Sequence, residues 1–178
     1  MRTSSQTVLT LAIVTATSFF CILVSAADQA PAEIKIATWN AGALLTAFAP
    51  ARRRKLAALR QLLLSSDVVC IQELHGSVAE KTRWAAQFSE KFLVFFDGAL
   101  SATGGIATIL AKDKFKNFTC MAETLACGRV LKVTATPVHG VPVCIVNIHN
   151  EQLCAAEVDL VCQAVRELSD IRSPDVLP

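Results

Sequence analysis

Residues 34–40, Ile-Lys-Ile-Ala-Thr-Trp-Asn, and residues 67–73, Asp-Val-Val-Cys-Ile-Gln-Glu, are the two runs that decide the fold. Both are short apolar runs rich in β-branched residues, which is typical of strands. Each run ends on a polar side chain, Asn40 or Glu73, of a type that holds metal ions or phosphates. The sequence therefore predicts two strands that deliver these side chains at their C-terminal ends.

The segment between these runs predicts a helix over residues 51–65. Its apolar stripe is formed by Leu56, Leu59 and Leu63 at helical spacing. Strand, helix and strand in this order are typical of a β-α-β unit, whose two strands are parallel. Because the C-terminal ends of such strands lie side by side, where ligands tend to bind, we expect Asn40 and Glu73 to meet in space.

The rest of the chain alternates further strands and helices. The predicted elements are a helix at residues 77–88, strands at 92–96, 105–110, 129–136 and 141–148, and a helix at 151–171. The first of these helices begins with a capping box formed by Ser77 and Glu80. The apolar face of the last helix comprises Leu153, Ala156, Leu160, Ala164, Leu168 and Ile171. This order predicts an α/β fold, a layered α/β sandwich with a mixed β-sheet.

Length and composition suit one domain with its own core. The chain has 178 residues, of which 53% are hydrophobic, and a net charge of +2. That charge is too small to argue by itself for a nucleic-acid partner. Residues 52–55, Arg-Arg-Arg-Lys, gather positive charge at the start of the first helix, where it opposes the helix dipole. They predict either attraction for phosphate or a solvated face.

Residues 1–27 predict a targeting segment, followed by a linker at residues 28–33. Arg2 is the only charged residue before Asp28, and residues 8–24 form a mostly apolar run closed by small residues. A cleaved signal peptide is the first prediction, and an uncleaved signal anchor with membrane contact through residues 8–24 is the second. An error in the gene assignment and a helix packed on the domain are the remaining alternatives. We therefore predict a secreted or membrane-anchored protein.

Six of the seven cysteines follow this N-terminal segment. Cys70 and Cys144 lie within apolar runs, so we expect small buried thiols. Cys120 and Cys127 lie on either side of an apparent turn, and a disulfide between them is an alternative if the chain is exported. None of the cysteine spacings resembles a zinc site.

Trp39-Asn40 and Gln72-Glu73, each at the end of a predicted strand, resemble the endonuclease/exonuclease/phosphatase superfamily. That group includes deoxyribonucleases, abasic-site endonucleases, sphingomyelinases and inositol polyphosphate 5-phosphatases. The resemblance covers residues 34–178 and implies the N-terminal portion of such a domain.

The resemblance implies roles for four residues. Glu73 is expected to hold Mg²⁺ (or Mn²⁺), and Asn40 to order the phosphate and metal site. His149 is expected to act on the scissile phosphate as a general acid/base or hydrogen-bonding group. Arg129 is expected to bind substrate phosphate, since a planar guanidinium matches two phosphate oxygens. A structural His149 and a surface Arg129 are the alternatives.

Three further residues are weaker candidates for the same site. Asn147 and Asn150 flank His149, and which of them faces a substrate phosphate depends on the strand register. His75 follows Glu73 closely and is a candidate for lining the site.

The implied function is divalent-metal-dependent phosphodiester hydrolysis, with nucleic acid as the first substrate class and a phospholipid or inositol phosphate as the second. Members of the superfamily also use an Asp-x-Asn motif and a closing Asp-His pair, and these 178 residues contain neither. We therefore expect a partial active site and little activity from this chain alone. The alternative is a non-catalytic remnant or a membrane-anchored binding module. The oligomeric state is left open.

Overall fold

The computed structural model describes residues 8–16, 19–27, 34–46, 48–97, 104–139, 142–149 and 153–170. The helices in this part of the chain are α1 (Ala49–Ser65), α2 (Val78–Ala86) and α3 (Ala155–Asp170). The strands are β1 (Val8–Ala16), β2 (Phe19–Ala27), β3 (Ile36–Asn40), β4 (Val68–Gln72), β5 (Phe92–Phe96), β6 (Ile106–Ala111), β7 (Phe118–Ala126), β8 (Val130–Pro137) and β9 (Val143–His149). Every strand and helix predicted after residue 33 is present; β5 has the predicted ends, and the ends of the other elements are shifted.

The strands form two sheets. The five-stranded sheet has the order β1-β2-β9-β8-β7, and all its neighbouring strands are antiparallel. The four-stranded sheet has the order β3-β4-β6-β5 and is mixed, since β3 and β4 are parallel and β6 is antiparallel to both of its neighbours. The predicted α/β class with a mixed sheet is therefore confirmed.

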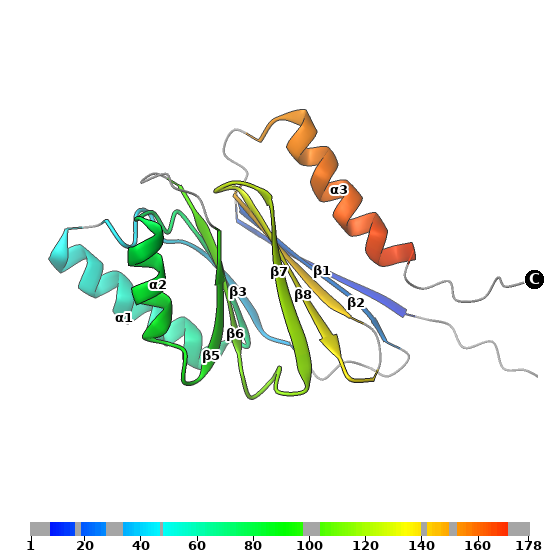
Figure 1. Ribbon diagram of the computed structural model, residues 1–178, viewed down its shortest axis with the longest axis horizontal. Coiled ribbons are helices and arrows are strands. Elements are labelled where there is room, and N and C mark those ends of the chain that lie inside the picture. The colour runs from blue at the N-terminus through cyan, green and yellow to red at the C-terminus, as the bar shows by residue number, and fades with distance from the viewer. Residues whose placement is uncertain are drawn as a thin grey trace, which may run out of the picture.

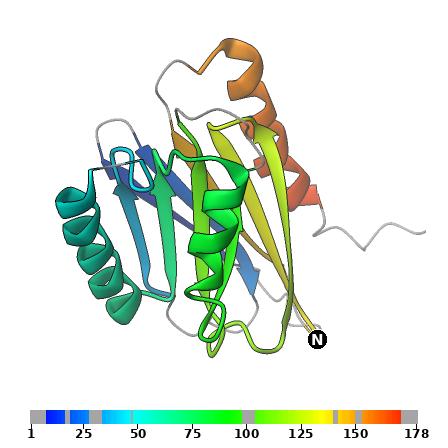
Figure 2. The same ribbon diagram turned by 60° about the vertical axis from the view of Figure 1, so that its left-hand side comes forward.

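The two sheets face each other, and helices cover their outer sides (Figure 1). Helices α1 and α2 lie against the four-stranded sheet, while α3 lies on the far side of the five-stranded sheet (Figures 1 and 2). The core between the sheets includes Val68, Cys70, Leu110, Phe115, Leu131, Val133 and Ile145. Cys70 and Cys144 are buried thiols, as predicted.

The predicted β-α-β unit is present. Strand β3 pairs with β4 in parallel, and Asn40 lies opposite Gln72 at the last pair of the register. Helix α1 connects the two strands and starts with Pro50 in its first turn, where the missing N–H has no helical partner to lose. Leu59 and Leu63 of its predicted stripe are buried against the sheet. The unit thus brings the C-terminal ends of β3 and β4 to one edge.

Helix α3 packs through a stripe that matches the predicted one only in part: Ala164 is buried and Leu153 packs against the sheet, as predicted. Val161, Ala164 and Val165 face the five-stranded sheet, whereas Leu160 is 41% exposed and Ala156 is exposed. The prediction for Ala156 and Leu160 was therefore wrong. The outer face of that sheet offers the apolar side chains of Val146 and Ile148, and the β-branched valines of α3 pack against this patch.

Strand β7 was not predicted. It is an edge strand with a bulge near its end, and most of its side chains are exposed, so it lacks the alternating apolar pattern of a half-buried strand. Cys120 lies within β7 and Cys127 follows it. Both are free thiols, so the alternative of a Cys120–Cys127 disulfide is not realised.

The residues predicted to form a targeting segment include β1 and β2. These strands form a hairpin, and β2 pairs antiparallel with β9 from Ser25 opposite Val143 to Phe19 opposite His149. The predicted linker at residues 28–33 lies outside the described residues. None of the helices in the described ranges is both long enough and apolar enough to cross a membrane.

Candidate functional site

Four predicted site residues meet at one end of the two sheets. Asn40 ends β3, Glu73 follows β4, His149 ends β9 and Arg129 precedes β8. Nδ2 of Asn40 donates to Oε1 of Glu73 at 2.7 Å, and the same carboxylate oxygen lies 3.6 Å from Nε2 of His149. Nδ1 of His149 lies 3.4 Å from Nη1 of Arg129. The four side chains therefore form one continuous polar cluster.

Glu73 is held by an unusual backbone. Its φ is +54°, in the left-handed region that residues other than glycine rarely adopt. Its carbonyl accepts a hydrogen bond of 2.9 Å from the backbone N–H of Ala43. Strained conformations of this kind persist where neighbouring contacts fix them, and they gather at functional sites. The carboxylate is 26% exposed, so solvent and a ligand can reach it.

Asn40 orients the carboxylate. Its Oδ1 accepts from the backbone N–H of Gly42 at 2.9 Å, which turns the Nδ2 group towards Glu73. Nζ of Lys55 in turn donates to the carbonyl of Gly42. This bond to the loop after β3 therefore holds Lys55, which belongs to the basic start of α1, next to the site.

His149 and Arg129 approach from the other sheet. The His149 side chain is only 3% exposed, and its backbone N–H donates to the carbonyl of Arg129 at 2.7 Å. This bond fixes the Arg129 backbone beside the end of β9, and Arg129 as a whole is half-buried. A histidine between a carboxylate and a guanidinium can exchange hydrogen bonds with either neighbour.

His75 also lies near the cluster, again with a positive φ of +55°. Partial burial lowers the pKa of His75 below its usual value of 6.5, Glu73 opposes the shift, and Lys55 and Lys81 add to it. The lowered pKa favours the neutral imidazole of His75, which can both accept and donate a hydrogen bond.

Asn147 lies inside the protein and not at the rim. Its Nδ2 donates to the carbonyls of Ile71 and Ala107 at 3.2 and 2.8 Å, and its Oδ1 accepts from Nε2 of Gln72 at 2.7 Å. This places Asn147 as a link between the two sheets, with its amide engaged by protein groups. Asn150 lies outside the described residues.

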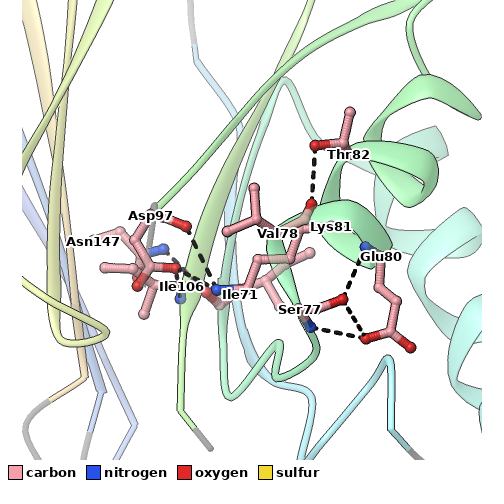
Figure 3. A network of polar contacts seen from close by, with 9 residues as sticks. All are labelled: Ile71, Ser77, Val78, Glu80, Lys81, Thr82, Asp97, Ile106 and Asn147. Atoms are coloured by element: carbon pink, nitrogen blue, oxygen red, sulfur yellow. Dashed lines mark hydrogen bonds and ion pairs between the residues drawn. The ribbon is translucent and has the colours of Figure 1, made fainter. Parts of the chain in front are cut away.

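An ion pair between Lys81 and Asp97, which was not predicted from the sequence, lies close to the cluster. Nζ of Lys81 lies 3.0 Å from Oδ1 of Asp97, and both side chains are fully buried (Figure 3). The helical spacing could have indicated that Lys81 is buried, because Lys81 lies three residues before Trp84 and therefore on the same inward face of α2.

The donor set fits a metal ion only in part. In the described part of the chain, no group of three or more histidine, cysteine, aspartate or glutamate side chains gathers to hold one. Mg²⁺, however, is commonly held by one or two carboxylates together with water and substrate phosphate. Glu73 is exposed enough to serve as such a ligand, with Asn40 steadying its carboxylate.

Two cavities of about 390 and 470 Å³ lie at the opposite end of α1 from this cluster. They share Leu63, Leu64, Lys91 and Phe92. Neither contains a member of the cluster, which is instead an open rim where two sheets meet.

The cluster combines an amide, a carboxylate, an imidazole and a guanidinium, and successive groups lie 2.7, 3.6 and 3.4 Å apart. Such a set can bind a divalent cation on one side and an anionic oxygen on the other. Comparison of the chain with protein-family models and with curated proteins finds no match.

Proposed function

We propose that the cluster is the metal- and phosphate-binding part of a phosphodiesterase site of the endonuclease/exonuclease/phosphatase type. The observation that carries this proposal is the convergence of Asn40, Glu73, His149 and Arg129 from four separate elements. Two facing sheets flanked by helices also agree with the layered fold that the resemblance implies.

Each residue has a distinct role in this proposal. Arg129 binds two phosphate oxygens through its planar guanidinium. His149, next to both Arg129 and Glu73, donates a hydrogen bond or a proton to the bound phosphate. Glu73 holds Mg²⁺ (or Mn²⁺), and Asn40 keeps that carboxylate in place. The metal ion neutralises charge on the phosphate and on the leaving oxygen.

Nucleic acid is the substrate class that we favour. The basic start of α1 supports it, because Lys55 contacts the loop after Asn40 and places positive charge next to the cluster. A run of cations beside a phosphate site attracts a polyanion more than a single phosphate group. A phospholipid or an inositol phosphate is the second candidate class.

Metal binding by the whole chain tests the proposal. Titration with Mn²⁺, followed by electron paramagnetic resonance, is expected to detect a site that Glu73→Gln weakens by about tenfold or more. Glu90→Gln is the matched control, because Glu90 is an exposed carboxylate in the turn before β5. Equal Mn²⁺ affinities in all three proteins would contradict the proposal.

Substrate comparison then separates the candidate functions. Plasmid DNA, sphingomyelin and an inositol phosphate are incubated with the chain and Mg²⁺, and binding and hydrolysis are measured separately. Glu73-dependent cleavage of DNA supports the nuclease assignment. Metal-dependent DNA binding without cleavage supports a non-catalytic binding module built on the same cluster.

A further inference from the structure

The buried pair of Lys81 and Asp97 has no role in the proposed chemistry. Lys81 lies in α2, Asp97 follows β5, and the contact between them is 3.0 Å with both side chains fully buried. Transferring both charges out of water is costly, and a buried ion pair is weak evidence for a stabilising role. Oδ2 of Asp97 is also buried, and it has no hydrogen-bond partner among the described residues.

The pair holds the diglycine turn, formed by Gly104 and Gly105. Oδ1 of Asp97 accepts from the backbone N–H of Ile106 at 3.2 Å, directly after the turn (Figure 3). A Cβ on Gly105 would lie only 2.9 Å from Nζ of Lys81 and 3.3 Å from Oδ1 of Asp97. Gly105 also has a φ of +93°, which a residue with a side chain rarely adopts. The turn therefore lies directly against the buried charges.

The diglycine turn in turn holds the Glu73 loop, defined as residues 73–75. The carbonyl of Gly105 accepts from the N–H of Leu74 at 2.9 Å, and the carbonyl of Gly104 accepts from the N–H of His75 at 2.7 Å. These bonds flank the strained φ of Glu73 on its C-terminal side. Removal of their support would allow the loop to relax towards ordinary backbone angles.

We propose that Lys81 and Asp97 are positioning residues for Glu73, which they hold in its metal-binding orientation through the diglycine turn. Neither residue contacts the ligand. Their buried charges fix the turn, the turn fixes the backbone of the Glu73 loop, and the loop directs the carboxylate towards Asn40 and His149. The inference rests on the proposed role of Glu73 as a metal ligand.

The test replaces the ion pair by a neutral pair of similar volume, Lys81→Met with Asp97→Asn. The matched control is Lys114→Met with Asp67→Asn, which makes the same charge change in an ion pair of 3.9 Å with partly exposed side chains. Full chains are compared by cooperative thermal unfolding, by Mn²⁺ affinity and by hydrogen exchange of the Leu74 and His75 amides. The last two measurements are made well below the unfolding temperature.

We expect the Lys81/Asp97 variant to bind Mn²⁺ about tenfold more weakly, as for other residues that orient a metal ligand. The Leu74 and His75 amides are expected to exchange about tenfold faster, while the control variant matches the wild type. A variant that melts earlier but keeps wild-type Mn²⁺ affinity and amide exchange would overturn the inference, since its role would then be structural only. If the double variant does not fold, Asp97→Asn alone decides by the same two measurements.

Glu73→Gln in the same series separates the two proposals. Unchanged Mn²⁺ binding in Glu73→Gln would refute the metal site itself, while the exchange rates of Leu74 and His75 still report whether the pair holds the loop. Lost Mn²⁺ binding in Glu73→Gln, with unchanged binding and exchange in the Lys81/Asp97 variant, would refute only the positioning role.

Discussion

Oδ1 of Asn147 accepts a hydrogen bond of 2.7 Å from Nε2 of Gln72, and this bond joins the two sheets inside the protein. Gln72 precedes Glu73 at the end of β4, and Asn147 lies shortly before His149 in β9. Nε2 of Gln72 also donates to Oγ1 of Thr38 in β3 at 3.0 Å. One buried amide pair therefore fixes the relative position of two strand ends in different sheets. One of them carries the proposed metal ligand and the other the proposed acid.

Asn147→Ala is expected to lower the free energy of unfolding by about 3 kcal/mol. The change removes three buried hydrogen bonds, to Gln72, Ile71 and Ala107, and the loss of partners for buried polar groups costs about 1–3 kcal/mol. Urea denaturation measures the loss. Asn117→Ala, at an exposed asparagine, should stay within about 0.5 kcal/mol of the wild type. Equal stabilities of the two variants would refute the role of Asn147 as an inter-sheet link.

Arg129→Ala is expected to weaken binding of a short DNA duplex in the presence of Mg²⁺ by about tenfold or more, because a charge-assisted bond contributes about 1.5–3 kcal/mol. Arg129→Lys keeps the charge but loses the forked geometry, so it should recover only part of the affinity. Fluorescence anisotropy at several salt concentrations measures both variants.

The matched control for Arg129 is Arg60→Ala. Arg60 is exposed on α1 and lines a cavity at the end of that helix far from the cluster. Its removal should leave the affinity close to that of the wild type. If Arg60→Ala and Arg129→Ala weaken DNA binding equally, then Arg129 contributes only general positive charge and not a phosphate contact.

The meeting of Asn40 and Glu73 was predictable because it depends on local patterns. Two β-branched runs joined by one amphipathic helix leave few topologies, and parallel pairing brings their C-terminal ends to one edge. His149 and Arg129 followed from the hairpin of β8 and β9, whose pairing is also local in sequence. The hydrogen bond of 2.7 Å between Asn40 and Glu73 thus follows from the geometry of a single β-α-β unit.

Contacts between elements that are far apart in the chain were harder to predict from the sequence. Whether Asn147 faces the rim or the inter-sheet space depends on which side of β9 packs against β4, and a shift by one residue would reverse the answer. The Lys81–Asp97 pair joins α2 to the end of β5, and a lysine within a helix ordinarily predicts a solvated side chain. Edge strand β7 is mostly exposed and therefore has little apolar pattern to read.

Glu80→Gln is expected to destabilise the protein in a pH-dependent way. Hydrogen bonds from the backbone and side chain of Ser77 hold the pKa of Glu80 below its usual value of 4.5. The unfolded state, with the ordinary pKa, binds more protons between the two values, so this stabilisation is present above about 4.5 and is lost as the pH falls through the native pKa. The wild type and the variant should therefore differ at pH 7 and converge in acid.

Urea denaturation across this pH range tests the Glu80 prediction. Glu90→Gln serves as the control, since its exposed carboxylate lies outside the capping box of α2. A difference between the wild type and Glu80→Gln that stays constant with pH would attribute the effect to side-chain shape and not to the charge.

Removal of residues 1–27, the predicted targeting segment, should expose one edge of β9. Strand β2 pairs with β9 along its whole length, from Ser25 opposite Val143 to Phe19 opposite His149, and every side chain of β9 is buried. An unpaired apolar strand recruits another strand, so we expect the shortened chain to self-associate and to unfold at lower urea concentration. Light scattering over a range of protein concentrations measures the association.

Ile22→Pro distinguishes strand pairing from the mere loss of apolar residues. Ile22 lies opposite Val146, and a proline there removes a ladder hydrogen bond while it keeps the length of the N-terminal segment. If β2 completes the sheet, then Ile22→Pro should self-associate as the shortened chain does. A shortened chain that stays monomeric with wild-type stability would contradict the strand role. It would favour the prediction of a cleaved signal peptide, which N-terminal sequencing of protein exported from cells tests directly.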